Sequence, residues 1–315
     1  MACGGRVKLS DFWLNHGDAS VFAKSQWPIH RFIYPAWRVF LALYLLGWLI
    51  FRLAIEKNFG GFFVFLTDWT FLVLTLYAVS SCIGVIYFTF ADRSNRFYSK
   101  DTASQPENVT VQDLGSNMNV TSTELPTPRR PLEGAVRPPL PHYFKFVWVL
   151  FNICLAVDPI ITVVYWSFLA PQEESGLGLA LDIHFHALNT VFIYADLLVS
   201  AIPVRVVHSV YPFLYGTVYI SFTLIYFWSG GVNPYSGETA IYPGVLDWSQ
   251  AGWTVLSCVV ISITVPLIHL FGYGVYRLRV YIHKRYFGRR PEENCNLTTA
   301  EETPDTFYSE HQQDM

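Results

Sequence analysis

The sequence predicts an all-α integral membrane protein, a bundle of six transmembrane helices with both termini in the cytoplasm. The 315-residue chain is 52% hydrophobic and only 14% charged, whereas soluble domains carry about 25% charged residues. So low a charge also excludes nucleic acid as a partner and argues against a disordered chain. Six apolar segments are long enough to cross a bilayer, which takes roughly 20 helical residues.

The predicted spans cover residues 36–54, 62–90, 143–168, 183–202, 209–229 and 252–276. The second span is longer than a bilayer requires, so we expect it to tilt or to project into the cytoplasm. The third contains Asp158-Pro159, which predicts a kink. The fourth has low hydropathy because it holds two His, two Asp and one Asn. Pro203 and Pro212 favour the end of the fourth helix and the start of the fifth.

The basic residues predict the orientation of the bundle. Of the 21 Lys and Arg residues, all but Arg52 and Lys57 fall in segments or flanks that six spans place on one side. Loops rich in Lys and Arg stay in the cytoplasm, so both termini and the second and fourth loops are predicted to be cytoplasmic.

The spans divide the chain into five regions. An N-terminal cytoplasmic segment (1–35) precedes the first two helices (36–90). The stretch 91–142 is rich in Ser, Thr, Asn and Pro and is predicted to be a disordered cytoplasmic linker. Helices three to six follow in 143–276, and the cytoplasmic tail 277–315 is basic at first and then predicted to be disordered.

The fourth span carries a polar face. At 100° per residue, Asp182, His186, Asn189 and Asp196 fall within about 40° of one direction. Polar side chains are costly in hydrocarbon and usually face the interior of a bundle. Thr67 lies at a similar depth on the second span, since both helices enter the membrane from the outer side. We therefore predict that Thr67 and His186 meet in the outer third of the bilayer.

A Thr hydroxyl beside a His forms a nucleophile and base that cleave an ester carbonyl. Two structural alternatives stay open. A membrane-helix Thr commonly bonds the carbonyl four residues earlier or joins helices, and His186 can pair with Asp182. A metal or haem site from His184, His186 and His208 is not favoured, because His-x-His directs the two rings to opposite faces. No cofactor is expected.

A block that starts in the fourth span has a specific pattern: Asn189, Asp196, Pro203, Val204, Arg205, His208, Tyr211, Pro212, Tyr226, Gly230, Gly231, Tyr242, Pro243, Asp247 and Trp248. It resembles the rolling stone family of multi-span membrane proteins, most clearly over 143–276. The resemblance implies a role in myoblast fusion and muscle development at the plasma membrane, with an endomembrane location as the alternative.

Gly60, Gly61, Leu66 and Thr67, together with His186, are distantly similar to the androgen-induced-gene family of six-span membrane hydrolases. That similarity implies a Thr nucleophile at Thr67, a His base at His186, and fatty-acid esters of hydroxy fatty acids as substrates. The long loop 91–142 departs from that family.

We therefore expect a rolling-stone-type membrane protein of cell fusion, with an intramembrane threonine hydrolase of lipid esters as the alternative. A transporter or channel is less favoured, because no charged pathway crosses both halves of the bundle. Membrane lipids are the expected partners.

The predicted topology is tested with epitope tags. Tags at either terminus should bind antibody only after cells are permeabilised, because both ends are predicted to be cytoplasmic. Staining of intact cells at either end would contradict the six-span orientation.

Overall fold

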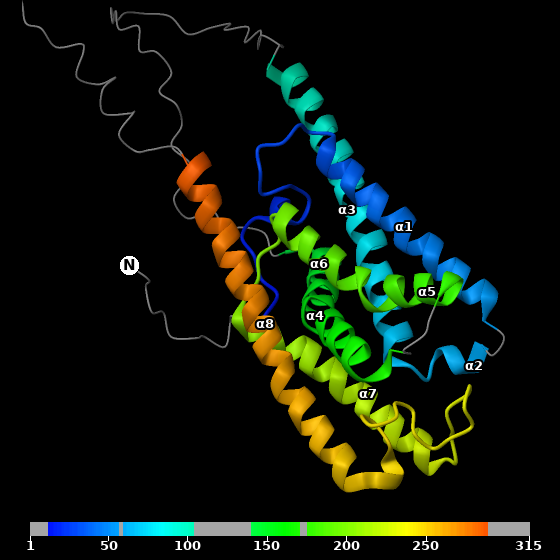
Figure 1. Cartoon of the computed structure of the whole chain (residues 1–315). Helices are drawn as coiled ribbons and strands as arrows, with labels where there is room; N and C mark the ends of the chain where they lie inside the picture. The colour runs from blue at the N-terminus through cyan, green and yellow to red at the C-terminus, as the bar shows by residue number, and fades with distance from the viewer. Residues whose placement is uncertain (1–11, 57–58, 104–139, 171–174, 289–315) are drawn as a thin grey trace, which may run out of the picture.

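The computed structural model describes residues 12–56, 59–103, 140–170 and 175–288, with the backbone alone for 91–103. It is all-helical, as predicted, and six of its described helical segments are long and apolar enough to span a membrane (Figure 1). The principal helices are α1 (Ile33–Ile55), α2 (Phe59–Phe62), α3 (Leu66–Ala103), α4 (His142–Val164), α5 (Gly176–His186), α6 (Leu188–Val199), α7 (Val210–Trp228) and α8 (Ala251–Phe287).

Two helices continue past their predicted bounds. α3 continues to Ala103, into the stretch predicted to be a linker, and α8 continues to Phe287, into the predicted tail. Both extensions carry charged residues and remain helical, because each residue added to a nucleated helix contributes one more backbone hydrogen bond. The remainder of the predicted linker, 104–139, and of the tail, 289–315, lies outside the described residues.

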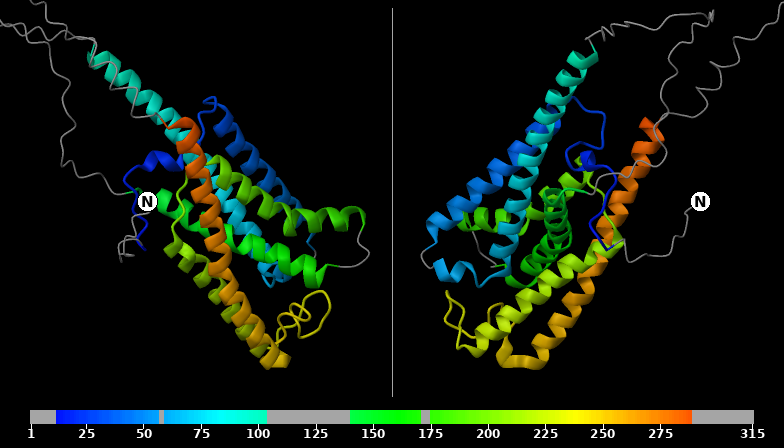
Figure 2. Two further views of the ribbon diagram at one scale, coloured as in Figure 1. Left: turned by 60° about the vertical axis from the view of Figure 1, so that its left-hand side comes forward. Right: turned by 180° about the vertical axis from the view of Figure 1, so that it is seen from behind.

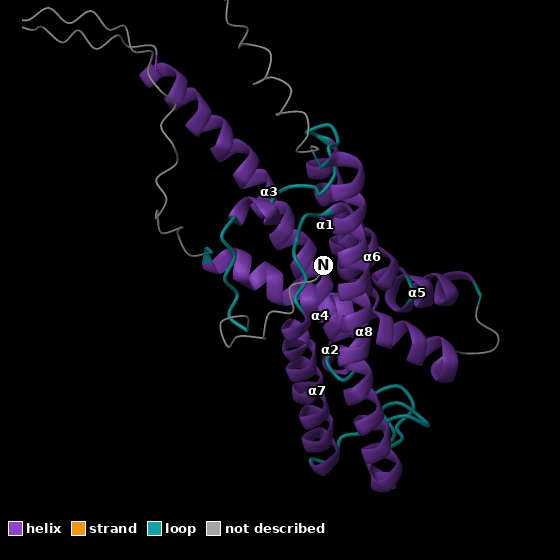
Figure 3. Cartoon of the chain, turned by 90° about the vertical axis from the view of Figure 1, so that its left-hand side faces the viewer, coloured by secondary structure: helices purple, strands orange, loops and turns teal. Residues whose placement is uncertain are grey.

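The fourth span is two helices and not one. α5 ends at His186 and α6 begins at Leu188, with Ala187 between them at φ −125° and ψ −50°. α5 bends away from the direction of α6 (Figures 1 and 3). Broken helices occur at membrane depth where the freed backbone is buried in protein or lines a cavity. The prediction of a continuous helix over 183–202 was therefore wrong at this residue.

α4 is the central helix of the bundle and contacts α3, α6, α7 and α8 (Figure 2). Its sequence is apolar on nearly all sides, which is the pattern of a helix that is buried all round. Trp148 is fully buried and its indole donates to the carbonyl of Pro203 at 2.7 Å. Asn152 is buried too, and its side-chain oxygen lies 2.9 Å from Nε2 of His269 on α8.

A buried ion pair joins α1 to α6. Arg38 Nη1 lies 2.9 Å from Oδ2 of Asp196, and both side chains are essentially inaccessible to solvent. Tyr77 on α3 donates to the same carboxylate, and Trp37 donates to its other oxygen at 2.9 Å. Arg38 also donates to Tyr34 at 2.6 and 3.1 Å. Every charge in the pair is therefore hydrogen-bonded, which a buried ion pair requires.

The end of α6 is closed by the N-terminal segment and by α8. Gln26 donates its backbone N–H to the carbonyl of Val199 at 3.1 Å, and Ser25 pairs with Ser200 in an isolated antiparallel bridge. Arg279 is buried and donates to the carbonyls of Leu197, Ser200 and Ile202. A guanidinium at this position satisfies the carbonyls that a helix C-terminus leaves free.

α4 and α8 approach closely at Gly272. A Cβ added at this glycine would lie 2.9 Å from Cγ of Leu155, which is fully buried. Small residues allow helices in membranes to pack at short distance. The sequence offers the same residue type two positions later at Gly274, where nothing lies within 4 Å of the added Cβ.

Gly272→Ala should therefore destabilise the bundle by about 1–3 kcal/mol through overpacking. Gly274→Ala is the matched control and should be neutral or slightly stabilising, because Ala has the higher helix propensity. Thermal unfolding of the purified proteins in detergent, followed with a thiol-reactive dye, measures both effects, since Cys82 and Cys154 are free and buried. Equal midpoints for the two variants would show that α4 and α8 are not closely packed at Gly272.

Candidate functional site

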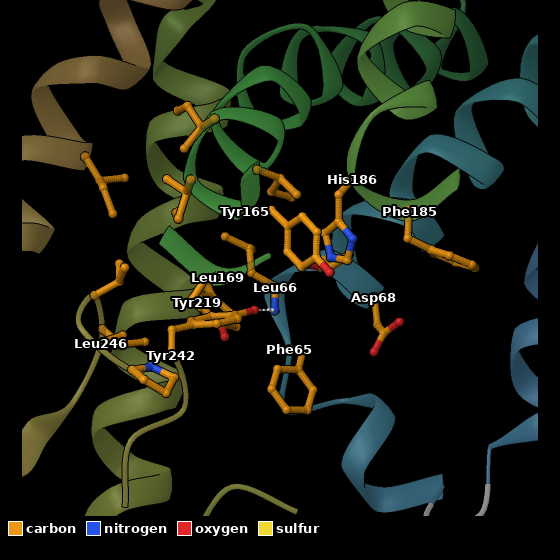
Figure 4. A pocket seen from close by; sticks show the side chains of 18 of the residues that line it. Phe65, Leu66, Asp68, Tyr165, Leu169, Phe185, His186, Tyr219, Tyr242 and Leu246 are labelled. Atoms are coloured by element: carbon orange, nitrogen blue, oxygen red, sulfur yellow. Dashed lines mark hydrogen bonds between the residues drawn. The ribbon is translucent and has the colours of Figure 1, made fainter. Parts of the chain in front are cut away.

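A cavity of about 520 Å³ lies between the start of α3, the ends of α4 and α5, the middle of α7, and α8 with the loop before it (Figure 4). Its volume falls within the usual range of small-molecule sites, about 300–1,000 Å³. Most of the wall is aliphatic or aromatic. The charged and hydroxyl-bearing side chains on it include Arg52, Thr67, Asp68, Asp182 and His186.

Thr67 lines this cavity from the first turn of α3. Gly60 and Gly61 lie in the short helix α2, just before this helix begins. The hydroxyl of Tyr242 accepts a hydrogen bond from the backbone N–H of Leu66 at 2.8 Å and so occupies part of the helix terminus (Figure 4). Burial raises the pKa of Tyr242 to about 12, so it stays an uncharged phenol. The helix N-terminus places a partial positive charge beside Thr67.

His186 lines the same cavity from the last position of α5. Its Nδ1 lies 3.2 Å from the carbonyl oxygen of Asp182 and 3.7 Å from Oδ1 of the Asp182 side chain. The imidazole stacks on Tyr165 with a centroid distance of 3.4 Å and an angle of 4° (Figure 4). Tyr165 opens the π-helical turn Tyr165–Leu169 at the end of α4, and such turns occur frequently at functional sites. The ring plane and the Nδ1 contact are thus both fixed.

Arg52 holds a cluster of charged and phenolic groups at one end of the cavity. It pairs with Glu56, and its Nε lies 3.5 Å from Oδ1 of Asp68. The hydroxyl of Tyr235 accepts from Arg52 at 3.2 Å and donates to Glu56 at 2.6 Å. Our sequence reasoning did not assign Arg52 to the site. The sequence does contain one indication of this role. Arg52 and Lys57 are the two basic residues predicted on the outer side of the membrane.

The structure thus brings Thr67 and His186 to the wall of one cavity. Among the described residues no hydrogen bond joins the two side chains. With Nδ1 of His186 directed at its own helical turn, Nε2 is the nitrogen that remains for a ligand in the cavity. Such a wall can bind a molecule with one polar group and an apolar remainder.

The polar face predicted along the fourth span is divided by the break at Ala187. Asp182 and His186 line the cavity, whereas Asn189 and Asp196 are buried in the helical packing. Asn189 donates to the carbonyl of Phe185 at 3.2 Å and accepts from the N–H of Thr190 at 2.8 Å. Asp196 is held in the ion pair with Arg38. These last two residues stabilise the bundle and do not line the cavity.

The remaining polar candidates lie elsewhere in the bundle. His184 stacks on Trp48 at 3.7 Å, and His208 packs against Trp148. In the part of the chain that the structure describes, no group of three His, Cys, Asp or Glu side chains is arranged to hold a metal ion. Asp158 is fully buried in α4, and neither of its side-chain oxygens has a hydrogen-bond partner there.

Comparisons with known proteins give one consistent match. The family model described as "Protein rolling stone" matches residues 5–118 and 136–291. The protein named "Protein rolling stone" from Drosophila melanogaster is 28% identical over 286 residues, which cover 90% of each chain. No solved structure matches.

Asp196 and Asp182 are predicted to differ in their roles. Asp196→Leu leaves Arg38 buried without its counter-charge and should cost about 3–5 kcal/mol of stability. Thermal unfolding in detergent measures this loss, and the double variant Arg38→Met/Asp196→Leu should recover most of it. Asp182→Asn, which changes only the cavity wall, should leave the free energy of unfolding within about 0.5 kcal/mol of the wild type. Equal losses for the two Asp variants would contradict this division of roles.

Proposed function

Because the chain belongs to the rolling stone family, we propose that it acts in cell fusion and muscle development at the plasma membrane, through hydrolysis of a lipid ester in its cavity. The biological role follows the resemblance to that family. The molecular activity rests on one observation, which is that a hydroxyl and an imidazole, Thr67 and His186, line the same largely apolar cavity.

The proposed reaction has two steps. Nε2 of His186 removes the proton from Oγ1 of Thr67 as this oxygen attacks the ester carbonyl carbon. The tetrahedral oxyanion collapses, the bond to the alcohol oxygen breaks, and the imidazolium returns its proton to the departing alcohol. A water molecule then attacks the acyl-threonine and gives its proton to His186, which passes it to Thr67. One ester and one water yield one fatty acid and one alcohol.

Three features of the site support this assignment. The N-terminal position of Thr67 on α3 places the helix dipole where negative charge develops, and such preorganised dipoles lower the barrier. Asp182 contacts Nδ1 of His186 at 3.7 Å, a carboxylate that stabilises the imidazolium. Tyr165 holds the ring by stacking.

A structural fusion factor that binds lipid without cleaving it is the second candidate. It is favoured by the local contacts of His186, which is bonded within its own turn and lies against Tyr165 without a hydrogen bond to Thr67 in the described residues. The two candidates predict different results for conservative substitutions at these positions.

Thr67→Val and His186→Gln should each lower ester hydrolysis by about 100-fold or more, because each removes a catalytic group. The double variant should be scarcely slower than either single variant, since groups that act together are not additive. The measurement is release of fatty acid from a fatty-acid ester of a hydroxy fatty acid and from a monoacylglycerol, with purified full-length protein. Fluorophosphonate labelling should be lost from Thr67→Val.

Thr75→Val is the matched control. Thr75 lies on the same helix, is buried, bonds the carbonyl of Phe71 at 2.8 Å and does not line the cavity. It should retain hydrolysis and probe labelling. Two results together would reject the enzyme and favour the structural factor. The wild-type protein would show no hydrolysis, and cells with Thr67→Val or His186→Gln at normal protein levels would still fuse.

A further inference from the structure

A second cavity of about 320 Å³ adjoins the first between α4 and α8. Both cavities are lined by Ile160, Val164, Val245, Ser257 and Ile261, so they share a wall. The second cavity adds mainly aliphatic and aromatic residues to this shared wall. The two volumes thus form a path that is charged at one end and apolar at the other.

The apolar end opens on the outer surface of the bundle. Val163 and Phe168 on the α4 side and Leu256 and Val260 on the α8 side line it and are 51–70% exposed. In a bilayer these residues of two membrane-spanning segments face acyl chains. A hydrocarbon chain can therefore enter from the bilayer without crossing water.

The charged end carries an excess of carboxylates. Arg52 is its guanidinium, and it is already paired with Glu56 and Asp68. Asp182 lies at His186 on the same cavity wall, so the wall carries two carboxylates, Asp68 and Asp182, and one guanidinium, while Glu56 lies behind it. A ligand with a negative charge would be repelled by these carboxylates, and the one guanidinium near them is already paired. Hydroxyl or amino groups, by contrast, donate hydrogen bonds that carboxylates accept.

We propose that the cavity binds an ester lipid whose head group bears hydrogen-bond donors and no negative charge, with one acyl chain lying in the second cavity between α4 and α8. This inference rests on the proposed function, because it names the substrate class of the same site. It predicts that, of the two ester substrates named above, the uncharged monoacylglycerol is preferred to the fatty-acid ester of a hydroxy fatty acid, which carries a free carboxylate. It also places Thr67 between the head group and the chain.

The test uses two photoreactive probes with the same diazirine-bearing acyl chain, a monoacylglycerol and a free fatty acid. The purified full-length protein in lipid nanodiscs is irradiated with each probe, and labelling is quantified. The monoacylglycerol should label about tenfold or more above the fatty acid, equivalent to at least about 1.4 kcal/mol in binding. Unlabelled monoacylglycerol should compete, and unlabelled fatty acid should not.

Ile261→Trp fills the shared wall and should lower monoacylglycerol labelling about tenfold. Ile263→Trp is the matched control, because Ile263 lies on the same helix, is 58% exposed and lines neither cavity. It should label as the wild type does. Leu256→Trp blocks the same path from an exposed position, where the substitution does not disturb packing, and it should also label less than Ile263→Trp. Asp68→Asn/Asp182→Asn should raise fatty-acid labelling.

Thr67→Val separates this inference from the enzymatic proposal. It should abolish hydrolysis yet keep monoacylglycerol labelling, because the hydroxyl acts in chemistry and not in binding. Labelling without any hydrolysis in the wild type would retain the lipid site and reject the enzyme. Equal labelling by both probes, or equal labelling of the Leu256→Trp and Ile263→Trp variants, would overturn the inference itself.

Discussion

The buried ion pair between Arg38 and Asp196 is the contact on which the arrangement of the bundle depends. It fixes the rotation of α6 against α1, and the hydroxyl of Tyr77 adds α3 to the same network. Two charges in a membrane interior are tolerated only when they are paired and fully hydrogen-bonded. Because α6 cannot rotate without breaking this network, the end of α5 that carries His186 is also held toward α3.

The break at Ala187 separates the residues that line the cavity from the residue held in the ion pair. A continuous fourth helix would keep Asp182 and His186 on one line with Asp196, inside the packed bundle. The two helices α5 and α6 instead direct the first pair to the cavity and the last residue to the core. Irregular backbone at membrane depth is stable only against protein or a cavity, so the break and the cavity depend on each other.

The two ends of the bundle are built differently. At the end of α6, Arg279 and the N-terminal segment satisfy the free carbonyls, so this end is closed by hydrogen bonds. At the cavity end, Arg52 is matched by more than one carboxylate and Tyr242 lies over the first turn of α3. The closed end stabilises the fold, and the cavity end retains polar groups that a ligand can engage. The hydrolysis that we propose would take place at the cavity end.

The sequence by itself determined the class of protein, the six spans and the membership of Thr67 and His186 in polar stretches, because hydropathy and spacing are local properties of the chain. It also marked Asp196 as costly in hydrocarbon, but as part of the same face as His186. Only the tertiary structure decided that Asp196 pairs with Arg38, that Arg52 belongs to the cavity, and that the fourth span breaks at Ala187. These outcomes depend on which side chain of a distant helix lies opposite, and no local pattern encodes that partner.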